Sequence, residues 1–285
     1  MRNIDFYDFD SVLAEEQILV RDTVRTFVNE QVLPNIGQWC AEGVFPGKLI
    51  EPIGEMGLLG STLPEEYGGA GLDSLSYGLI MQELERGDSG LRSFASVQGA
   101  LVMYPIFSFG SEEQKQKYLP MMASGELIGC FGLTEPDGGS NPADMRTTAK
   151  KVDGGWLLNG TKIWITNATM SGAAVVFAQT GDTHRDIRGF IVDSDTGGFT
   201  ANPIRKKIGL KPPGPGIAVS KKLRTAFKPT RTPNRAICLA LDAASPWVSM
   251  IKATNDRPPT VANNSGESTA WAKPPVGCSR GTKKG

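Results

Sequence analysis

LIGCFGLTEPDGGSNP occupies residues 127–142, and WLLNGTKIWITN occupies residues 156–167. The first stretch begins as a short apolar run before a glycine-rich loop, which predicts a buried strand. The second contains two β-rich runs around Asn159-Gly160, a dipeptide typical of tight turns, and predicts a β-hairpin. Residues 173–180 (AAVVFAQT) and 187–193 (IRGFIVD) predict two further strands. We therefore expect a central antiparallel β domain.

The residues before this β region carry helical patterns. Apolar residues recur at helical spacing through residues 11–33, and Pro34 predicts the end of that helix. The same spacing predicts helices at residues 48–56, 74–85 and 95–107. Ser111, three residues before Gln114, provides a capping-box start for one more helix. A helical region followed by a β region is typical of an α+β chain with segregated domains rather than of repeated βαβ units.

The composition changes near Lys211. Residues 1–210 hold 17 Lys and Arg against 27 Asp and Glu, whereas residues 211–285 hold 13 against 3 and 10 of the 19 prolines. We expect a helical domain at 1–126, a central β domain at 127–210 and a basic, irregular tail at 211–285, because such a segment buries too little apolar surface to offset its chain entropy. Within the tail only residues 236–251 (AICLALDAASPWVSMI) predict a short helix. The abrupt change favours a truncation or a change of reading frame.

The composition also disfavours several functional classes. The four cysteines form no CxxC pair and His184 is the single histidine, so we expect no metal site. No run of about 18 apolar residues is present to span a membrane. The N-terminus is acidic and unlike a targeting segment, which favours the bacterial cytoplasm or the mitochondrial matrix. Neither GxGxxG after a strand nor GxxxxGK[ST] is found, so a flavin would need a site other than a Rossmann crevice.

Residues 130–142 (CFGLTEPDGGSNP) and 159–167 (NGTKIWITN) together resemble the paired flavin-binding signatures of the acyl-CoA dehydrogenase family, and the glutaryl-CoA dehydrogenases are the most similar subgroup. The resemblance extends from near the N-terminus to about Leu210, which covers the family's N-terminal helical domain and central β domain. It implies FAD as the cofactor, an acyl-CoA substrate with glutaryl-CoA favoured, an electron-transfer flavoprotein as electron acceptor and a homotetramer.

The resemblance further implies the residues that contact the flavin. In the glycine-rich loop, backbone N–H groups and hydroxyls suit the polar edge of an isoalloxazine ring and a pyrophosphate. In the second motif, Trp164 offers a flat apolar face and Thr166 a hydroxyl. Ordinary strand packing is the alternative for Trp164. The expected cofactor residues are Phe131, Leu133, Thr134, Gly139, Ser140, Trp164, Ile165 and Thr166, and Ser140 is also expected near the acyl-CoA.

Residues 83–98 (ELERGDSGLRSFASVQ) carry the resemblance to the glutaryl subgroup. There an Arg-Ser pair and a nearby Glu meet the far carboxylate of the substrate, and the matching substrate residues here are Arg92, Ser93, Ser96 and Glu85. A carboxylate that enters an apolar pocket needs a partner, and a planar guanidinium can hold it with two hydrogen bonds. The alternative is that Arg92 pairs with Glu85 or Asp88 on a solvated face.

In the family, a carboxylate base removes the α-proton while the β-carbon passes hydride to the flavin, and in the glutaryl subgroup decarboxylation to crotonyl-CoA follows. That base normally lies in a C-terminal four-helix domain. No residue of this sequence matches it, so no catalytic residue is assigned.

Three other functions stay open at this point. The first is a short-chain acyl-CoA dehydrogenase of other specificity, with Arg92 in a structural role. The second is an inactive, truncated fragment that binds flavin or acyl-CoA. The third is a nucleic-acid binder that uses the basic tail, which is disfavoured because the tail holds three aromatic residues and no recognised reading motif.

Overall fold

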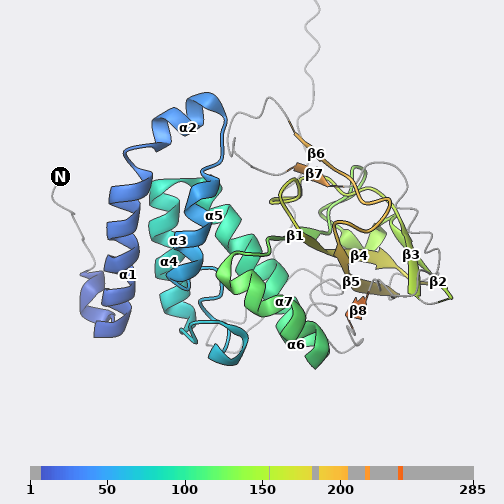
Figure 1. The fold of residues 1–285 in the computed structure, drawn as a ribbon, viewed down its shortest axis with the longest axis horizontal. Helices are drawn as coiled ribbons and strands as arrows, with labels where there is room; N and C mark the ends of the chain where they lie inside the picture. The colour runs from blue at the N-terminus through green and yellow to red at the C-terminus, as the bar shows by residue number, and fades with distance from the viewer. Residues whose placement is uncertain (1–7, 154, 182–185, 205–215, 219–236, 240–285) are drawn as a thin grey trace, which may run out of the picture.

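The computed structural model describes residues 8–153, 155–181, 186–204, 216–218 and 237–239. Figure 1 shows a helical part beside a twisted sheet, with the N-terminal helices farthest from the sheet. The predicted order of a helical region followed by a β region is confirmed. His184 and most of the predicted tail lie outside the described residues.

The helical part contains short and medium helices. The described α-helices are α1 (Glu15–Phe27), α2 (Ile36–Glu42), α3 (Ile50–Glu55), α4 (Ser74–Gly87), α5 (Ser89–Ser96), α6 (Tyr104–Phe109) and α7 (Glu112–Ser124). Two π-helical segments, η2 (Val28–Val32) and η5 (Val97–Met103), continue α1 and α5. Single 3₁₀ turns occupy η1 (Phe9–Val12), η3 (Gly47–Leu49), η4 (Glu65–Tyr67) and η6 (Pro142–Asp144).

Polar residues determine where three of these helices begin. A carboxylate oxygen of Asp73 accepts from the backbone N–H of Ser76 at 2.6 Å before α4, and Asp88 accepts from Leu91 N at 2.8 Å before α5. Ser111 and Gln114 form the reciprocal bonds of a capping box, so the predicted start of α7 is confirmed. Each cap satisfies an N–H group that the helix itself leaves unpaired.

The helix predicted at residues 95–107 has the wrong start and the wrong regularity. The Asp88 cap begins α5 at Ser89, and the chain then widens into the π-helical η5 before α6. A π segment accommodates one extra residue within a helical run. The apolar periodicity therefore located the helical region, but neither its cap nor its interruption.

The strands form one main sheet around β4. The described strands are β1 (Gly129–Gly132), β2 (Thr148–Val152), β3 (Gly155–Asn159), β4 (Ala173–Gln179), β5 (Ile187–Asp193), β6 (Ala201–Pro203), β7 (Gly216–Ala218) and β8 (Ile237–Leu239). The main sheet has the order β3-β2-β4-β5-β8, with β1 also paired to β4. The pairs β2–β3, β4–β5 and β5–β8 are antiparallel, and β1 and β2 run parallel to β4.

The hairpin predicted around Asn159-Gly160 is wrong. β3 ends at Asn159 and pairs with the preceding β2, while residues 160–170 contain no extended strand. A Cβ atom at Gly160 would lie 2.2 Å from Thr147 Oγ1, so this glycine permits a close crossing of two chain segments rather than a hairpin turn. Trp164 and Asn167 also have left-handed φ values of 62° and 67°, which a strand does not tolerate.

Two short strands lie within the predicted tail. β7 pairs with β6, and β8 pairs with β5 through Ile237, Cys238 and Leu239. The helix predicted at residues 236–251 is therefore wrong at 237–239, and its remaining residues lie outside the described part of the chain. Periodicity alone does not distinguish a short apolar helix segment from a strand, and the open edge of β5 provides backbone partners.

Both faces of the sheet are buried. Val175 and Phe177 of β4 belong to the core that also contains the helices, whereas Val176 and Ala178 belong to a second core on the opposite face. This alternation follows from the two-residue period of a strand. β4 is thus the layer between the two cores, and its neighbour β1 contacts η5 of the helical part.

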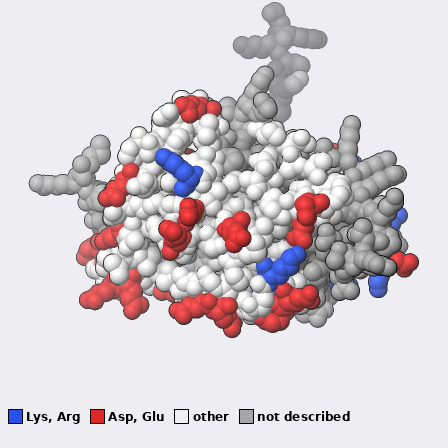
Figure 2. Space-filling view, viewed as in Figure 1, with Lys and Arg blue, Asp and Glu red and all other residues white. Residues whose placement is uncertain are grey.

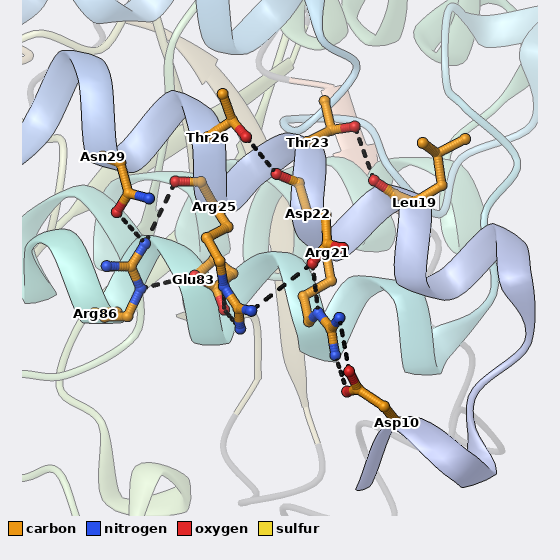
Figure 3. Close-up of polar contacts among 10 residues, drawn as sticks. All are labelled: Asp10, Leu19, Arg21, Asp22, Thr23, Arg25, Thr26, Asn29, Glu83 and Arg86. Carbon is orange, nitrogen blue, oxygen red and sulfur yellow. Dashed lines mark hydrogen bonds and ion pairs between the residues drawn. The ribbon is translucent and has the colours of Figure 1, made fainter. Parts of the chain in front are cut away.

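A network of ion pairs joins α1 to α4 (Figure 3). The side chain of Glu83 on α4 is 1% exposed and accepts from Arg25 of α1 at 2.7 Å and from Arg86 at 2.8 Å. Burial raises the pKa of Glu83, but the hydrogen bonds from the two arginines outweigh it, so the net pKa is lowered. Arg21, beside them on α1, pairs with Asp22 at 2.9 Å and with Asp10. The buried carboxylate is therefore held in its ionised form.

Glu83→Gln should lower the free energy of unfolding at pH 7 by about 1.5–3 kcal/mol, the range for hydrogen bonds to a charged group. Because the folded-state pKa lies below the unfolded value, this stabilisation is present above the ordinary glutamate pKa of about 4.3 and is lost as pH falls through the lowered folded value. Urea unfolding followed by circular dichroism at about pH 7 and about pH 3 measures the loss of stability and its dependence on pH. The exposed Glu51→Gln is the control, and an equal loss at both pH values would contradict the assignment.

Candidate functional site

The glycine-rich loop after β1 is organised around a buried carboxylate. Backbone bonds between Glu135 and Gly138 close a tight turn, at 2.8 Å and 3.2 Å. The Glu135 carboxylate accepts from the backbone N–H groups of Arg146 and Thr147 at 2.5 Å and 3.0 Å, and from Lys162 Nζ at 2.7 Å. Burial raises the pKa of Glu135, but these donors outweigh it and lower the pKa overall. The loop is therefore closed from inside by an ionised glutamate.

The two motifs that predict a flavin site lie directly against each other. Lys162 Nζ donates to the carbonyl oxygen of Leu133 at 3.0 Å, and the N–H of Ile163 donates to Thr134 O at 2.9 Å. These bonds connect the first loop to the segment that carries Trp164. Leu133 and Thr134 are both half-buried beside it. The structure thus brings together residues about 30 positions apart that sequence reasoning had associated only by resemblance.

Trp164 presents a large apolar side chain to solvent. It is 56% exposed and adopts a left-handed backbone conformation with φ 62°. A left-handed non-glycine residue is uncommon, and strained residues of this kind concentrate at functional sites. The alternative of ordinary strand packing is wrong, because Trp164 lies outside the strands and its ring is not buried. An exposed indole ring at this position is suited to stacking against another flat ring system.

The remaining expected cofactor residues have different environments. The ring of Phe131 on β1 packs against that of Phe177, with 5.2 Å between centroids. Gly139 and Ser140 are exposed in the loop, and Thr166 is half-buried. Ile165 is 3% exposed and packs in the second core, so its side chain points into the sheet.

Asn167, which sequence reasoning missed, joins this loop to the helical part. Its side chain is buried, and Nδ2 lies 3.3 Å from both Phe94 O on α5 and Gly129 O on β1. Its left-handed φ of 67° is one that Asn tolerates better than most residues. The sequence signal for this contact was the position of Asn167, a polar residue at the end of the apolar motif. Through Asn167 the tryptophan segment contacts the helix that carries Arg92.

Arg92, Glu85 and Ser96 form one cluster on α4 and α5. Arg92 Nε donates to Glu85 Oε2 at 2.6 Å, and Nη1 lies 3.5 Å from Ser96 Oγ. Ser93, which is half-buried, contributes its carbonyl oxygen to Ser96 Oγ at 3.2 Å. The side chains of Arg92 and Glu85 are 35% and 45% exposed. Hydrogen bonds from Ser89 and then Arg92 lower the pKa of Glu85.

A cavity of about 620 Å³ lies between the first turn of α4, η5, α6 and residues 59–63. Its lining is mainly apolar and includes Leu59, Leu63, Tyr77, Leu101, Tyr104 and Phe107. Burial raises the pKa of Tyr77, while the positive charge of Arg92 opposes that shift. No sequence pattern indicated this cavity.

The described residues contain neither a membrane-spanning helix nor a cluster of metal ligands. No helix there is both long and apolar enough to cross a membrane. No group of three or more His, Cys, Asp or Glu side chains in the described ranges could hold a metal ion.

The matches to known families agree with this arrangement. Residues 14–126 match the acyl-CoA dehydrogenase N-terminal domain, and residues 130–215 match the acyl-CoA dehydrogenase middle domain. The chain belongs to the acyl-CoA dehydrogenase family, of which it contains the N-terminal and middle domains.

Individual relatives include enzymes named for different substrates. The human mitochondrial short-chain specific acyl-CoA dehydrogenase is 40% identical over 201 residues, which are 70% of this chain and 49% of that protein. Glutaryl-CoA dehydrogenase from Mycobacterium smegmatis, solved with FADH2, is 46% identical with a TM-score of 0.69 over 77% of this chain and 58% of that one. Butyryl-CoA dehydrogenase from Megasphaera elsdenii is 32% identical with a TM-score of 0.68, over 77% and 57%. The chain thus spans about half the length of the curated relatives it matches.

Proposed function

We propose that this chain provides the flavin-binding and acyl-binding surfaces of an FAD-dependent acyl-CoA dehydrogenase that oxidises glutaryl-CoA and decarboxylates it to crotonyl-CoA. The observation that carries the proposal is the Arg92–Glu85–Ser96 cluster, which Asn167 connects to the exposed Trp164. A guanidinium suits an acyl chain that ends in an anion, because a carboxylate removed from water needs a charged, hydrogen-bonding partner.

The described residues fit a flavin. Trp164 offers an exposed ring face, and the neighbouring Thr134 and Thr166 offer hydroxyl groups. Ser140 and Gly139, exposed in the glycine-rich loop, would meet the pyrophosphate, with Ser140 also near the acyl-CoA. Bound FAD would supply the acceptor for the hydride that leaves the β-carbon. No residue of this chain is assigned as the base that removes the α-proton.

Arg92 is oriented for a second carboxylate. Nε donates to Glu85 and Nη1 lies 3.5 Å from Ser96 Oγ, and the five N–H donors of a guanidinium exceed these two contacts. Such a fork can bind a carboxylate with two parallel hydrogen bonds. The higher identity to the Mycobacterium smegmatis glutaryl-CoA dehydrogenase than to the Megasphaera elsdenii butyryl-CoA dehydrogenase supports this specificity.

A second candidate is a dehydrogenase for a short monocarboxylic acyl chain. Its supporting observation is that Glu85 already neutralises Arg92, while the nearby cavity is mainly apolar. The name of the human relative agrees with it. In that case the ion pair would be a half-exposed structural contact of the kind that contributes little energy.

Titration of the full chain with FAD, followed by titration of the loaded chain with glutaryl-CoA and butyryl-CoA, tests the proposal. Quenching of flavin fluorescence reports the first step and calorimetry the second. We expect FAD to bind and glutaryl-CoA to bind more tightly than butyryl-CoA. Equal or reversed affinities would favour the second candidate, and no FAD binding would contradict the flavin site.

The family resemblance extends the proposal to partners. An electron-transfer flavoprotein would accept the electrons, and the intact enzyme would be a homotetramer in the bacterial cytoplasm or the mitochondrial matrix. Nucleic-acid binding is disfavoured for the face drawn in Figure 2, because acidic side chains predominate over basic ones among its described charged groups, and acidic groups repel phosphates.

Trp164→Ala should weaken FAD binding by about 1–2 kcal/mol, roughly 5- to 30-fold, because it removes the exposed ring face. Its effect on the free energy of unfolding should be small, since the ring is largely exposed. Trp156→Ala is the matched control, because that ring packs against Phe190 at 5.4 Å in the second core. The control should lower stability and leave FAD affinity nearly unchanged. The reverse pattern would contradict the assignment of Trp164.

A further inference from the structure

Lys162 and Glu135 form a buried ion pair between the two proposed flavin segments. Their side chains are 1% and 5% exposed, and Nζ lies 2.7 Å from Oε1. Desolvation of two charges makes a buried pair no more stabilising than well-packed apolar side chains of similar volume. The pair therefore calls for an explanation other than stability, and its additional hydrogen bonds indicate one.

Every polar group of the pair holds backbone of the glycine-rich loop. Lys162 Nζ binds the Leu133 carbonyl where the chain leaves β1. Glu135 binds the N–H groups of Arg146 and Thr147 where the chain approaches β2. The stem of Lys162 also covers Gly132, where a Cβ atom would lie 3.4 Å from Lys162 Cγ. Both ends of the loop are thus fixed to one buried centre.

The same ion pair also adjoins the tryptophan segment. Lys162 is followed by Ile163, whose N–H binds Thr134 O at 2.9 Å, and then by the left-handed Trp164. On the other side of Trp164, Ile165 is buried in the second core. A left-handed residue costs about 1–2 kcal/mol and persists only where its neighbours are fixed. Lys162 and Ile165 are those fixed neighbours.

We propose that Lys162 and Glu135 are positioning residues for the flavin, which set the orientation of the Leu133 carbonyl and of the Trp164 ring. This inference rests on the proposed flavin site. The pair is almost completely buried, so we expect it to act through Leu133, Ile163 and Trp164. A purely structural pair would stabilise the fold without determining the affinity for FAD.

Variants that remove the charges of the pair distinguish a role in positioning the flavin from a role in stabilising the fold. Lys162→Met alone leaves Glu135 charged and unpaired, and it should destabilise the fold strongly. The double variant Lys162→Met with Glu135→Gln removes both charges and should regain most of that stability. Lys162→Arg keeps the charge and a donor, and provides a variant that folds if the neutral ones do not. Lys150→Met, at an exposed position of β2, controls for the loss of a lysine.

Three measurements on the full chain test the inference. They are urea unfolding, amide hydrogen exchange at Ile163 and titration with FAD. In the double variant we expect stability near that of the original chain, exchange at Ile163 at least 10-fold faster and FAD affinity at least 10-fold weaker. Tryptophan emission should shift, and Trp164→Phe should abolish that shift. Lys162→Arg should restore part of both the protection and the affinity.

A double variant that keeps the original Ile163 protection and FAD affinity would overturn the inference and leave the pair structural. If neither neutral variant folds, a folded Lys162→Arg that keeps its stability but loses part of the Ile163 protection and of the FAD affinity supports the inference. A folded Lys162→Arg that loses stability but keeps both the protection and the affinity overturns it. If the original chain binds no FAD, the proposed function fails. In that case, the exchange and emission measurements alone test whether the ion pair positions Trp164.

Discussion

Arg92→Ala should weaken the binding of glutaryl-CoA to the FAD-loaded chain by about 2–5 kcal/mol, the range for removal of one partner of a buried, hydrogen-bonded charge pair. Each 1.4 kcal/mol is a factor of ten in affinity. Butyryl-CoA has no far carboxylate, so its affinity should change little. Calorimetric titration of both thioesters against the original chain and the variant measures the difference between these two losses.

Two further variants make this result specific. Arg92→Lys keeps the positive charge but loses the planar fork, so it should recover only part of the glutaryl-CoA affinity. Arg188→Ala removes an exposed arginine of β5 and should leave both affinities unchanged. Equal losses for glutaryl-CoA and butyryl-CoA in Arg92→Ala would assign Arg92 to a structural role and favour the short-chain alternative.

The sequence predicted the parts of this fold that depend on local chemistry. Apolar spacing located α1 and α4, and the Ser111 capping box located α7. The apolar runs at 173–180 and 187–193 correspond to β4 and β5. In each case a single period or cap acts within a few residues and agrees with the tertiary structure.

Long-range polar contacts explain the main failure. Asn159-Gly160 is a strong local turn signal, but Glu135 is far away in sequence, and its ion pair with Lys162 holds the residues after Gly160 against the loop that follows β1. The local preference for a hairpin is weaker than the requirement that a buried charge be paired. No pattern within residues 156–167 shows that Lys162 is buried, so the crossing could not be predicted.

The sequence indicated which residues belong to the candidate substrate cluster, but not which of them pair with one another. Sequence reasoning left Glu85 and Asp88 as alternative partners of Arg92. The structure assigns Asp88 to the cap of α5 and pairs Arg92 with Glu85. Both roles suit a carboxylate at these positions, and the tertiary arrangement of α4 and α5 decides between them. The link from Asn167 to Phe94 depends on the same tertiary geometry.

The contact between β1 and η5 holds the proposed flavin segment against the helical part. Gly129 N donates to Gln98 Oε1 at 2.7 Å, and Gly129 O lies 3.3 Å from Asn167 Nδ2. A Cβ atom at Gly129 would lie 2.5 Å from Cγ1 of the fully buried Val102. Glycine is therefore required here by the close approach of η5.

Gly129→Ala should lower the free energy of unfolding by about 2–3 kcal/mol through overpacking. Val102→Ala should cost about 2 kcal/mol by leaving a cavity. In the double variant the added methyl group occupies space that Val102 vacates, so the combined loss should be at least about 1 kcal/mol smaller than the sum of the single losses. Urea unfolding of the original chain, the two single variants and the double variant measures this coupling in a double-mutant cycle. Gly138→Ala, where an added Cβ meets nothing within 4 Å, is the control. Additive losses would show that β1 and η5 relax independently, and the two halves of the proposed site would then lack the rigid connection that Gly129 provides.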